Sequence, residues 1–351
     1  MSTATLARLE VVPLSKHIGA EIRGIDLRDQ LDGETVDAIH QAWLDHTMLL
    51  FRGQNFSQED LVRVTAYFGE IGPLARPPKL FPKGYSKLLP NIMMISNIRE
   101  NGETIGALPD GEMHFHHDQI HAEIPHNGTL LYSVEVPTYG GDTLFASGYA
   151  AYDTLDPVVK AKLEGRRALH HYNYGTTTRG GTNGTEAFAE RIHPVFRTHD
   201  ETGRKTIYVN RLMTVRIEDM PPEESGALLN AVFDHSEKPE FVYRHAWRVG
   251  DLLVWDNRCS THARDDFPSD QRRLMLRTTV KGTKKPYRVQ ALRSPPAQHI
   301  GALATVAMFV GPSGTPRLRI IHRGGSVSWL GSRKAGPAMA ARQTNRDLPI
   351  L

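Results

Sequence analysis

Short apolar runs separated by turn-forming residues recur along most of the chain. Apolar runs of about four to eight residues with turn signals on both sides are typical of strands. We expect strands at 48–51, 93–96, 129–136, 142–147, 167–174, 241–247, 251–256 and 273–280. Residues 196–198 and 206–209 flank the turn sequence DETG, which predicts that these two segments pair as a hairpin.

Helical spacing of apolar residues occurs in fewer places. Ser57 is a candidate N-cap, and Asp60, three residues later, is a candidate partner in a capping box. The expected helices are 33–47, 57–68, 157–164 and 222–235. Many short strands with a few helical insertions favour an antiparallel sandwich or jelly roll over alternating strand and helix units.

Two segments show no sustained periodicity. Residues 73–110 are rich in Pro, Gly and Lys apart from the strand at 93–96, and a long segment of this kind predicts a functional loop or lid. We expect its first part, 73–90, to close over a pocket. Residues 290–351 hold many Gly, Pro, Arg and Ser residues and are expected to form a poorly ordered tail. The predicted folded domain is therefore 1–289.

The charge and cysteine content of the chain limit the kinds of partner and site that we expect. The chain has 351 residues, and 42 basic against 39 acidic side chains give a net charge of +3, which is not the concentrated basic character of nucleic-acid binding. We find neither a secretion signal nor an apolar run near the roughly 18 residues of a membrane span. The single cysteine, Cys259, excludes an intramolecular disulfide and a multi-cysteine metal site. We expect a cytoplasmic protein with a small-molecule partner.

The candidate chemistry lies in EMHFHHDQIH at 112–121 and WDNRCSTHARDD at 255–266. In a strand, His116 and Asp118 would project to the same side, and His262 follows a predicted strand much later in the chain. Two imidazoles and one carboxylate on one face of an octahedral ion leave three positions open, as in the Fe(II) oxygenases. Arg273 and Arg277 share one strand parity, and buried arginines need anionic partners such as the dicarboxylate 2-oxoglutarate.

Several ordered motifs carry a resemblance to a known family. They are IGAEIRGIDL at 18–27, FGEIGP at 68–73, FHHD at 115–118, VPTYGGDTLFAS at 136–147, HPVFRTHDETGRKTIYVN at 193–210, WDNRCSTH at 255–262 and RRLMLRTTVKG at 272–282. Over about residues 8–288 the sequence resembles the taurine dioxygenase/TfdA family of Fe(II)- and 2-oxoglutarate-dependent oxygenases. The family normally ends soon after the last motif, so residues 290–351 are atypical for it.

The resemblance implies a mainly β fold with a double-stranded β-helix (jelly-roll) core, and often a dimer or tetramer. It places the iron ligands at His116, Asp118 and His262. Thr143 and Arg273 match the residues that bind the far carboxylate of 2-oxoglutarate. Arg277 matches a second arginine, which lies near the cosubstrate's other end or near an anionic group of the substrate. The implied reaction hydroxylates a small, anionic organic substrate with O2 and yields succinate and CO2. The candidate substrates are an alkyl sulfate, a sulfonate, an aryloxyalkanoate or an amino-acid derivative.

Some residues depart from the family pattern or are assigned to other roles. Phe115 replaces a common Trp, and His117 replaces a small residue between the ligands and would lie beside the substrate entrance. Glu112 stands where the taurine enzymes carry a substrate-contacting Asn, which argues against taurine because a carboxylate repels a sulfonate. Tyr172 and Tyr174 could line the mouth of the pocket, but core packing is the favoured role. A non-catalytic jelly-roll binding protein and a zinc hydrolase remain as alternative functions.

Overall fold

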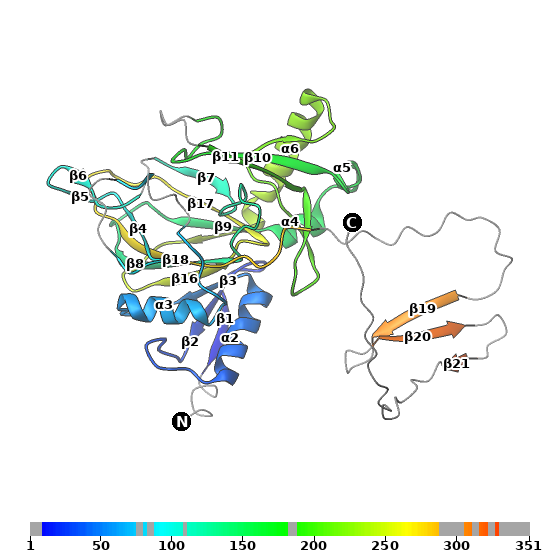
Figure 1. Ribbon diagram of the computed structural model, residues 1–351, viewed down its shortest axis with the longest axis horizontal. Coiled ribbons are helices and arrows are strands. Elements are labelled where there is room, and N and C mark those ends of the chain that lie inside the picture. The colour runs from blue at the N-terminus through cyan, green and yellow to red at the C-terminus, as the bar shows by residue number, and fades with distance from the viewer. Residues whose placement is uncertain are drawn as a thin grey trace, which may run out of the picture. The chain divides into compact units, whose positions relative to one another are not determined.

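The computed structural model describes residues 9–74, 80–82, 88–107, 111–181 and 188–287, together with three strands nearer the C-terminus. The chain divides into two compact units, Met1–Gln290 and Ala291–Leu351. The second unit contains an antiparallel sheet of β19 (Thr305–Val310), β20 (Pro316–Ile321) and β21 (Val327–Trp329), drawn in orange in Figure 1. The sequence did not predict these strands, because this part of the chain lacks a sustained two-residue period.

The first unit is built on two sheets. The larger has seven strands in the order β1-β2-β3-β16-β8-β18-β4, and the smaller has four in the order β15-β9-β17-β7. Neighbours in both sheets are antiparallel except β2 and β3, which are parallel. The larger sheet comprises β1 (Glu10–Pro13), β2 (Ala20–Arg23), β3 (Met48–Phe51), β16 (Leu252–Asp256), β8 (Gly128–Glu135), β18 (Leu274–Val280) and β4 (Met93–Ser96). The smaller comprises β15 (Val242–His245), β9 (Thr143–Ser147), β17 (Ser260–Arg264) and β7 (Met113–His116).

Alternation along the buried strands separates two apolar layers. On β16, Leu252 and Val254 join a cluster that includes residues of α2 (Gly33–His46) and α3 (Gln58–Ala66), the two helices on the outer face of the seven-stranded sheet (Figure 1). Leu253 and Trp255 point the other way and pack with Phe145 of β9. Both faces of the larger sheet are therefore buried, which explains why its central strands are continuous apolar runs.

The predicted helix starts are confirmed by their caps. Ser57 accepts a hydrogen bond from the backbone N–H of Asp60, and the Asp60 side chain accepts one from the backbone N–H of Ser57, which completes the capping box. Asp32 caps α2 through the backbone N–H of Thr35. Such caps satisfy N–H groups that the first helical turn leaves without partners.

A third group of elements packs beside the two sheets. β10, β11 and β14 form one sheet, and β12 pairs with β13 as the predicted hairpin. The bounds are β10 (Arg167–Asn173), β11 (Phe188–Pro194), β14 (Thr214–Ile217), β12 (Phe196–Thr198), β13 (Lys205–Ile207), α4 (Gly148–Thr154), α5 (Pro157–Leu163), α6 (Pro222–Ser236) and the 3-10 helix η2 (Pro239–Phe241). The helices α4, α5 and α6 contribute to a shared apolar cluster with these strands.

The predicted loop at 73–110 is only partly described. It contains β4 as expected, and also a short hairpin of β5 (Arg99–Glu100) and β6 (Glu103–Thr104) that the sequence did not predict. Most of the segment expected to close over a pocket, 73–90, lies outside the described residues.

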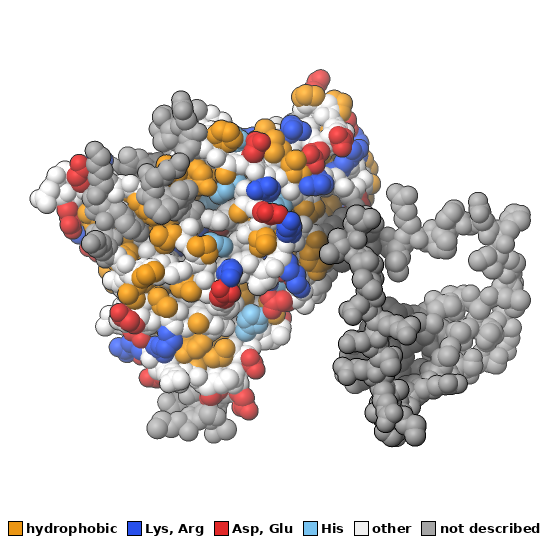
Figure 2. Space-filling model, in the orientation of Figure 1, with side chains coloured by type: hydrophobic (Ala, Val, Ile, Leu, Met, Phe, Trp, Pro, Cys, Tyr) orange, Lys and Arg blue, Asp and Glu red, His pale blue; other side chains and the backbone are white. Residues whose placement is uncertain are grey.

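The mainly β architecture, with helical additions and two largely antiparallel sheets, confirms the expected fold class. No helix in the described part of the chain is both long and apolar enough to cross a membrane. On the face shown in Figure 2, acidic and basic side chains are interspersed over the described residues, in keeping with their near-equal numbers in the sequence.

Candidate active site

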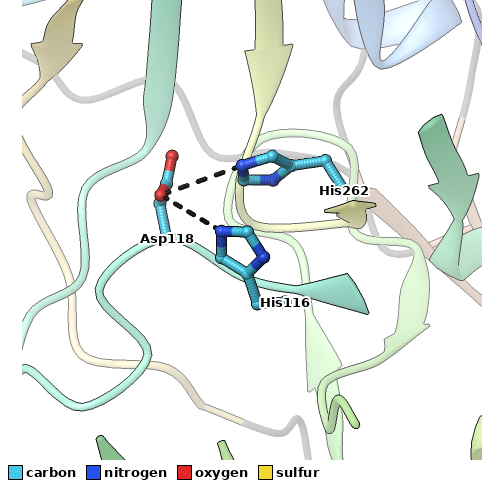
Figure 3. A group of neighbouring side chains, drawn as sticks. All are labelled: His116, Asp118 and His262. Atoms are coloured by element: carbon cyan, nitrogen blue, oxygen red, sulfur yellow. Dashed lines mark ion pairs between the residues drawn. The ribbon is translucent and has the colours of Figure 1, made fainter. Parts of the chain in front are cut away.

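His116, Asp118 and His262 converge at one end of the smaller sheet. His116 closes β7 and is paired in register with His262 of β17, so the two imidazole rings lie side by side with centroids 4.1 Å apart. The Nε2 atoms of His116 and His262 are 3.9 and 4.0 Å from Oδ1 of Asp118 (Figure 3). The structure therefore brings together the three residues that the sequence singled out.

Asp118 was expected to lie in the same strand as His116, but it does not. β7 ends at His116, and Asp118 lies in the following turn, where Gln119 has a positive φ of 58°. A turn, rather than strand alternation, directs the carboxylate back towards the imidazoles. His117 is fully buried against Tyr208, with a ring separation of 4.7 Å, so the expectation that it lies beside the substrate entrance is wrong.

Hydrogen bonds orient the three side chains. Nδ1 of His116 is 2.9 Å from the carbonyl oxygen of His114, to which it donates, so Nε2 is left as the acceptor that faces Asp118. The hydroxyl of Thr129 donates to Oδ2 of Asp118 over 2.6 Å, which leaves Oδ1 towards the imidazoles. Asn257 in turn donates its amide to Thr129 over 2.9 Å. Such outer contacts fix the direction of metal-binding groups.

The protonation states suit a divalent cation. Burial alone would raise the pKa of Asp118, but the charge of Arg277, together with His262 and His116 when they are protonated, outweighs it and holds that pKa well below its usual range. Burial lowers the pKa of both His116 and His262. At neutral pH the cluster therefore holds two neutral imidazoles and a carboxylate, whose potential ligand atoms lie within 4.8 Å of one another. This donor set fits the two-histidine, one-carboxylate site of Fe(II) oxygenases.

The cluster opens into a pocket that also contains the residues predicted to bind 2-oxoglutarate. Arg273 is 2% exposed, and its Nε has no hydrogen-bond partner among the described residues. Burial, followed by the charge of Arg264, lowers the pKa of Arg273 to about 9. An Nη atom of Arg277 lies 2.9 Å from Oδ2 of Asp118. The hydroxyl of Thr143 accepts a hydrogen bond from the indole N–H of Trp247 over 3.0 Å.

The remaining wall is mostly apolar and aromatic. It includes Met93, Ile95, Ala107, Met113, His121, Leu131, Tyr172, Tyr174, Leu212, Met213 and Trp255. Tyr172 and Tyr174 both line the pocket, which was the less favoured of their two expected roles, and His121 stacks on Tyr172 at 5.2 Å. Tyr172 also packs against an apolar cluster, in keeping with the favoured role. Arg264 is a further lining residue that sequence reasoning missed. The available signal was its position two residues after His262, which places both on one face of a strand.

Glu112 lies away from this pocket. Its side chain is 64% exposed and stands 3.6 Å from Nε2 of His114, and it is not part of the described lining. Glu112 is therefore not placed to repel a sulfonate in the described pocket.

A second group, His199, Asp256 and Cys259, has metal-ligand residue types but a different organisation. Nδ1 of His199 accepts backbone N–H groups of Glu201 and Thr202, so the proton is on Nε2, which donates to Asp256 over 3.0 Å. Arg258 supplies three more donors to the same carboxylate. The ligand atoms are already satisfied, and burial raises the pKa of the Cys259 thiol, so the group is an ion-pair network.

Comparisons with known proteins identify the family of this chain. The family described as "Taurine catabolism dioxygenase TauD, TfdA family" matches residues 10–279. The alpha-ketoglutarate-dependent 2,4-dichlorophenoxyacetate dioxygenase of Cupriavidus pinatubonensis is 31% identical over 278 residues, 76% of this chain and 96% of that protein. A taurine dioxygenase structure from Burkholderia xenovorans has a TM-score of 0.66 and 28% identity, and the match covers 90% of this chain and 97% of that one. AAD-2 in complex with Mn(II) and N-oxalylglycine has a TM-score of 0.64 and 28% identity, over 80% and 99% of the two chains.

These matches leave the non-catalytic and zinc hydrolase alternatives without support. The matched region spans the two sheets and every residue of the cluster and of the arginine set. The chain belongs to the TauD/TfdA family and is an Fe(II)- and 2-oxoglutarate-dependent dioxygenase.

Proposed function

We propose that His116, Asp118 and His262 bind the Fe(II) ion of this enzyme. The proposal is supported by the convergence of their ligand atoms and by the hydrogen bonds that leave Nε2 of His116 and Oδ1 of Asp118 directed inward. Iron bound there, with 2-oxoglutarate and O2, supplies the oxidative decarboxylation that yields succinate and CO2 and hydroxylates the substrate.

Arg273 and Thr143 hold the far carboxylate of 2-oxoglutarate in this proposal. A guanidinium that is 2% exposed, with an Nε–H lacking a partner among the described residues, is costly unless an anion binds it. A carboxylate can accept two parallel N–H bonds from such a group. Trp247 donates to the Thr143 oxygen, so the Thr143 hydroxyl hydrogen is available to the cosubstrate. Anchoring the far end fixes the orientation of the keto acid.

Charge in the pocket supports an anionic primary substrate, and this is the observation on which the substrate class rests. Arg264, Arg273 and Arg277 face one carboxylate, Asp118, in the described lining, which leaves two positive charges. Iron(II) adds two positive charges and dianionic 2-oxoglutarate removes two. The remaining positive charge favours a second anion beside Arg277, which lies 2.9 Å from Asp118 and therefore next to the proposed iron site.

The apolar wall restricts the rest of the substrate. Met113, Leu212, Met213 and Tyr172 offer an apolar and aromatic surface for a hydrophobic body. Asp118 is the only acidic residue of the described lining, so an ammonium group would find no acidic partner there. These features favour an aryloxyalkanoate or an alkyl sulfate over taurine or an amino acid. The relative that is a 2,4-dichlorophenoxyacetate dioxygenase supports the first of these classes.

An anaerobic titration tests the iron and cosubstrate assignments. Apo-protein receives Fe(II) and then 2-oxoglutarate, and we expect a visible metal-to-ligand charge-transfer band that is lost in His262→Ala. A folded wild-type protein without the band would contradict the proposal.

The substrate class is tested with matched pairs that differ in charge. Succinate formation is compared for phenoxyacetate against phenoxyethanol, and for hexyl sulfate against hexanol. We expect turnover only with the anions. Equal turnover of the neutral partners would refute an anionic substrate while leaving the iron assignment intact.

Two parts of the proposal concern the setting of the enzyme. A lone, buried cysteine and the need to keep iron reduced favour the cytoplasm. By likeness to the family we propose a homodimer or homotetramer, which light scattering on the purified protein tests directly. The catalytic domain of this proposal is 1–289.

A further inference from the structure

Arg264 occupies a defined place relative to the residues proposed for 2-oxoglutarate. It follows His262 by two positions on β17, so both side chains project to the cavity side of the smaller sheet. In the ladder between β17 and β9, Arg264 is directly opposite Thr143. Directly opposed residues on antiparallel strands have Cβ atoms about 5 Å apart. The Arg264 side chain therefore begins beside the Thr143 hydroxyl.

Arg264 and Arg273 also share an aromatic neighbour. The guanidinium carbons of Arg264 and Arg273 lie 5.7 and 6.0 Å from the centre of the Phe267 ring. After burial, the charge of Arg264 is the second cause that lowers the pKa of Arg273, as expected for neighbouring guanidinium groups. Both are largely buried, with exposures of 7% and 2%. Two adjacent buried cations repel each other, and an anion held between them relieves that repulsion.

From this placement we infer that Arg264 is a second arginine for the far carboxylate of 2-oxoglutarate, completing a clamp with Arg273 and Thr143. The inference rests on the proposed function, because it uses the cosubstrate position assigned to Arg273 and Thr143. A hydrogen bond from Arg264 to the carbonyl of Gly111 braces the guanidinium from outside the clamp. Two guanidinium groups on one carboxylate would make the site selective for dicarboxylic keto acids.

The test measures binding without turnover. Mn(II)-loaded protein is titrated without O2 with 2-oxoglutarate and, separately, with 2-oxopentanoate, which has the same chain but no far carboxylate. Arg264→Met should weaken 2-oxoglutarate binding about 10- to 100-fold, the range for a lost hydrogen bond to a charged group. Its affinity for 2-oxopentanoate should change by less than about threefold. Arg264→Lys keeps the charge and should recover part of the loss, and Arg273→Met is the positive control.

The outcomes separate this inference from the proposed function. If Arg264→Met weakens both ligands equally, or neither, Arg264 only braces the chain near Gly111 and the clamp is refuted. If 2-oxoglutarate binding is unchanged but the KM of the primary substrate rises, Arg264 serves the substrate and the inference is likewise overturned. Failure of wild-type protein to bind 2-oxoglutarate would instead reject the proposed function itself. Should Arg264→Met not fold, Arg264→Lys decides alone, since the clamp requires it to weaken only the dicarboxylate.

Discussion

Replacing Thr129 with valine tests whether the hydrogen-bond chain behind Asp118 prepares the iron site. Valine keeps the shape of threonine and removes its hydroxyl. That hydroxyl is fully buried, donates to Oδ2 of Asp118 over 2.6 Å and accepts from the amide of Asn257 over 2.9 Å. Without it, Asp118 loses the contact that holds Oδ1 towards the imidazoles. The Asn257 amide loses its acceptor as well.

The expected loss follows from the charge of the acceptor. A hydrogen bond to an ionised group is worth about 1.5–3 kcal/mol, and losing an outer-shell partner of a metal ligand typically lowers metal affinity about 10- to 100-fold. The two ranges agree, since each factor of ten corresponds to about 1.4 kcal/mol. The buried Asn257 amide left without an acceptor should also lower the free energy of unfolding by about 1–3 kcal/mol.

Anaerobic titration with Fe(II) measures the effect on affinity, and urea unfolding of the apo-protein measures the effect on stability. Thr129→Ser is the matched control because it keeps the hydroxyl and removes only a methyl group. We expect Thr129→Ser to bind iron much like the wild type. A folded Thr129→Val protein that binds Fe(II) within about threefold of the wild type would refute the reasoning.

Four further predictions concern other parts of the molecule. A hydrogen bond from His40 lowers the pKa of Glu201 to about 2, so this contribution to stability is complete above about pH 4.5 and is lost as the pH falls towards 2. Because Glu201 is 40% exposed, the effect on the free energy of unfolding should stay below about 1 kcal/mol. In urea unfolding measured at several pH values, Glu201→Gln should lose less stability than the wild type between pH 4.5 and 2. An identical loss in the two proteins would contradict the prediction. Asp256→Asn removes the buried carboxylate that pairs with Arg258 and leaves it the partly exposed Glu201 and the more distant Asp200. It should therefore cost about 3 kcal/mol of unfolding free energy, the low end for breaking a buried pair, whereas a loss under about 1 kcal/mol would show that the network is dispensable. Tyr172→Ala should raise the KM for phenoxyacetate more than for hexyl sulfate, because only the aryl body stacks on a ring; equal changes would argue against that contact. Removing residues 290–351 should leave Fe(II) binding unchanged, and loss of folded, iron-binding protein would refute this.

The sequence was sufficient to predict two kinds of element. These are strands that are buried on both faces and helix starts or turns whose contacts all lie within a few residues. The run at 48–51 is a strand because all four residues are buried between the outer helices and the inner layer. The capping box of Ser57 and Asp60 closes within three residues, so it needs no tertiary information. The hairpin flanking DETG was equally local.

Elements whose polar residues face the pocket or an ion-pair network escaped prediction. β17 carries no apolar alternation, because Ser260 bonds the Asp256 carbonyl and His262 faces the cluster. β17 pairs with both β7 and β9, which are distant in the sequence, so the pattern of apolar residues along β17 cannot predict this pairing. Asp118 was placed beside His116 on the wrong ground, since the turn at Gln119 directs its side chain.

Of the three arginines that line the pocket, two were predicted from the sequence and Arg264 was not. Arg273 and Arg277 were found because they lie in and beside a visibly apolar strand, where a charged residue is conspicuous. Arg264 lies among other polar residues and becomes conspicuous only when β17 is known to be a strand whose inner face already carries His262. Residues two positions apart in a strand point to the same side. This rule fails for Asp118, which lies in a turn, but it holds for Arg264, which lies in the same strand as His262. A strand that bears a metal-binding histidine should therefore be searched at both neighbouring inward positions for cosubstrate contacts, even where its sequence lacks apolar alternation.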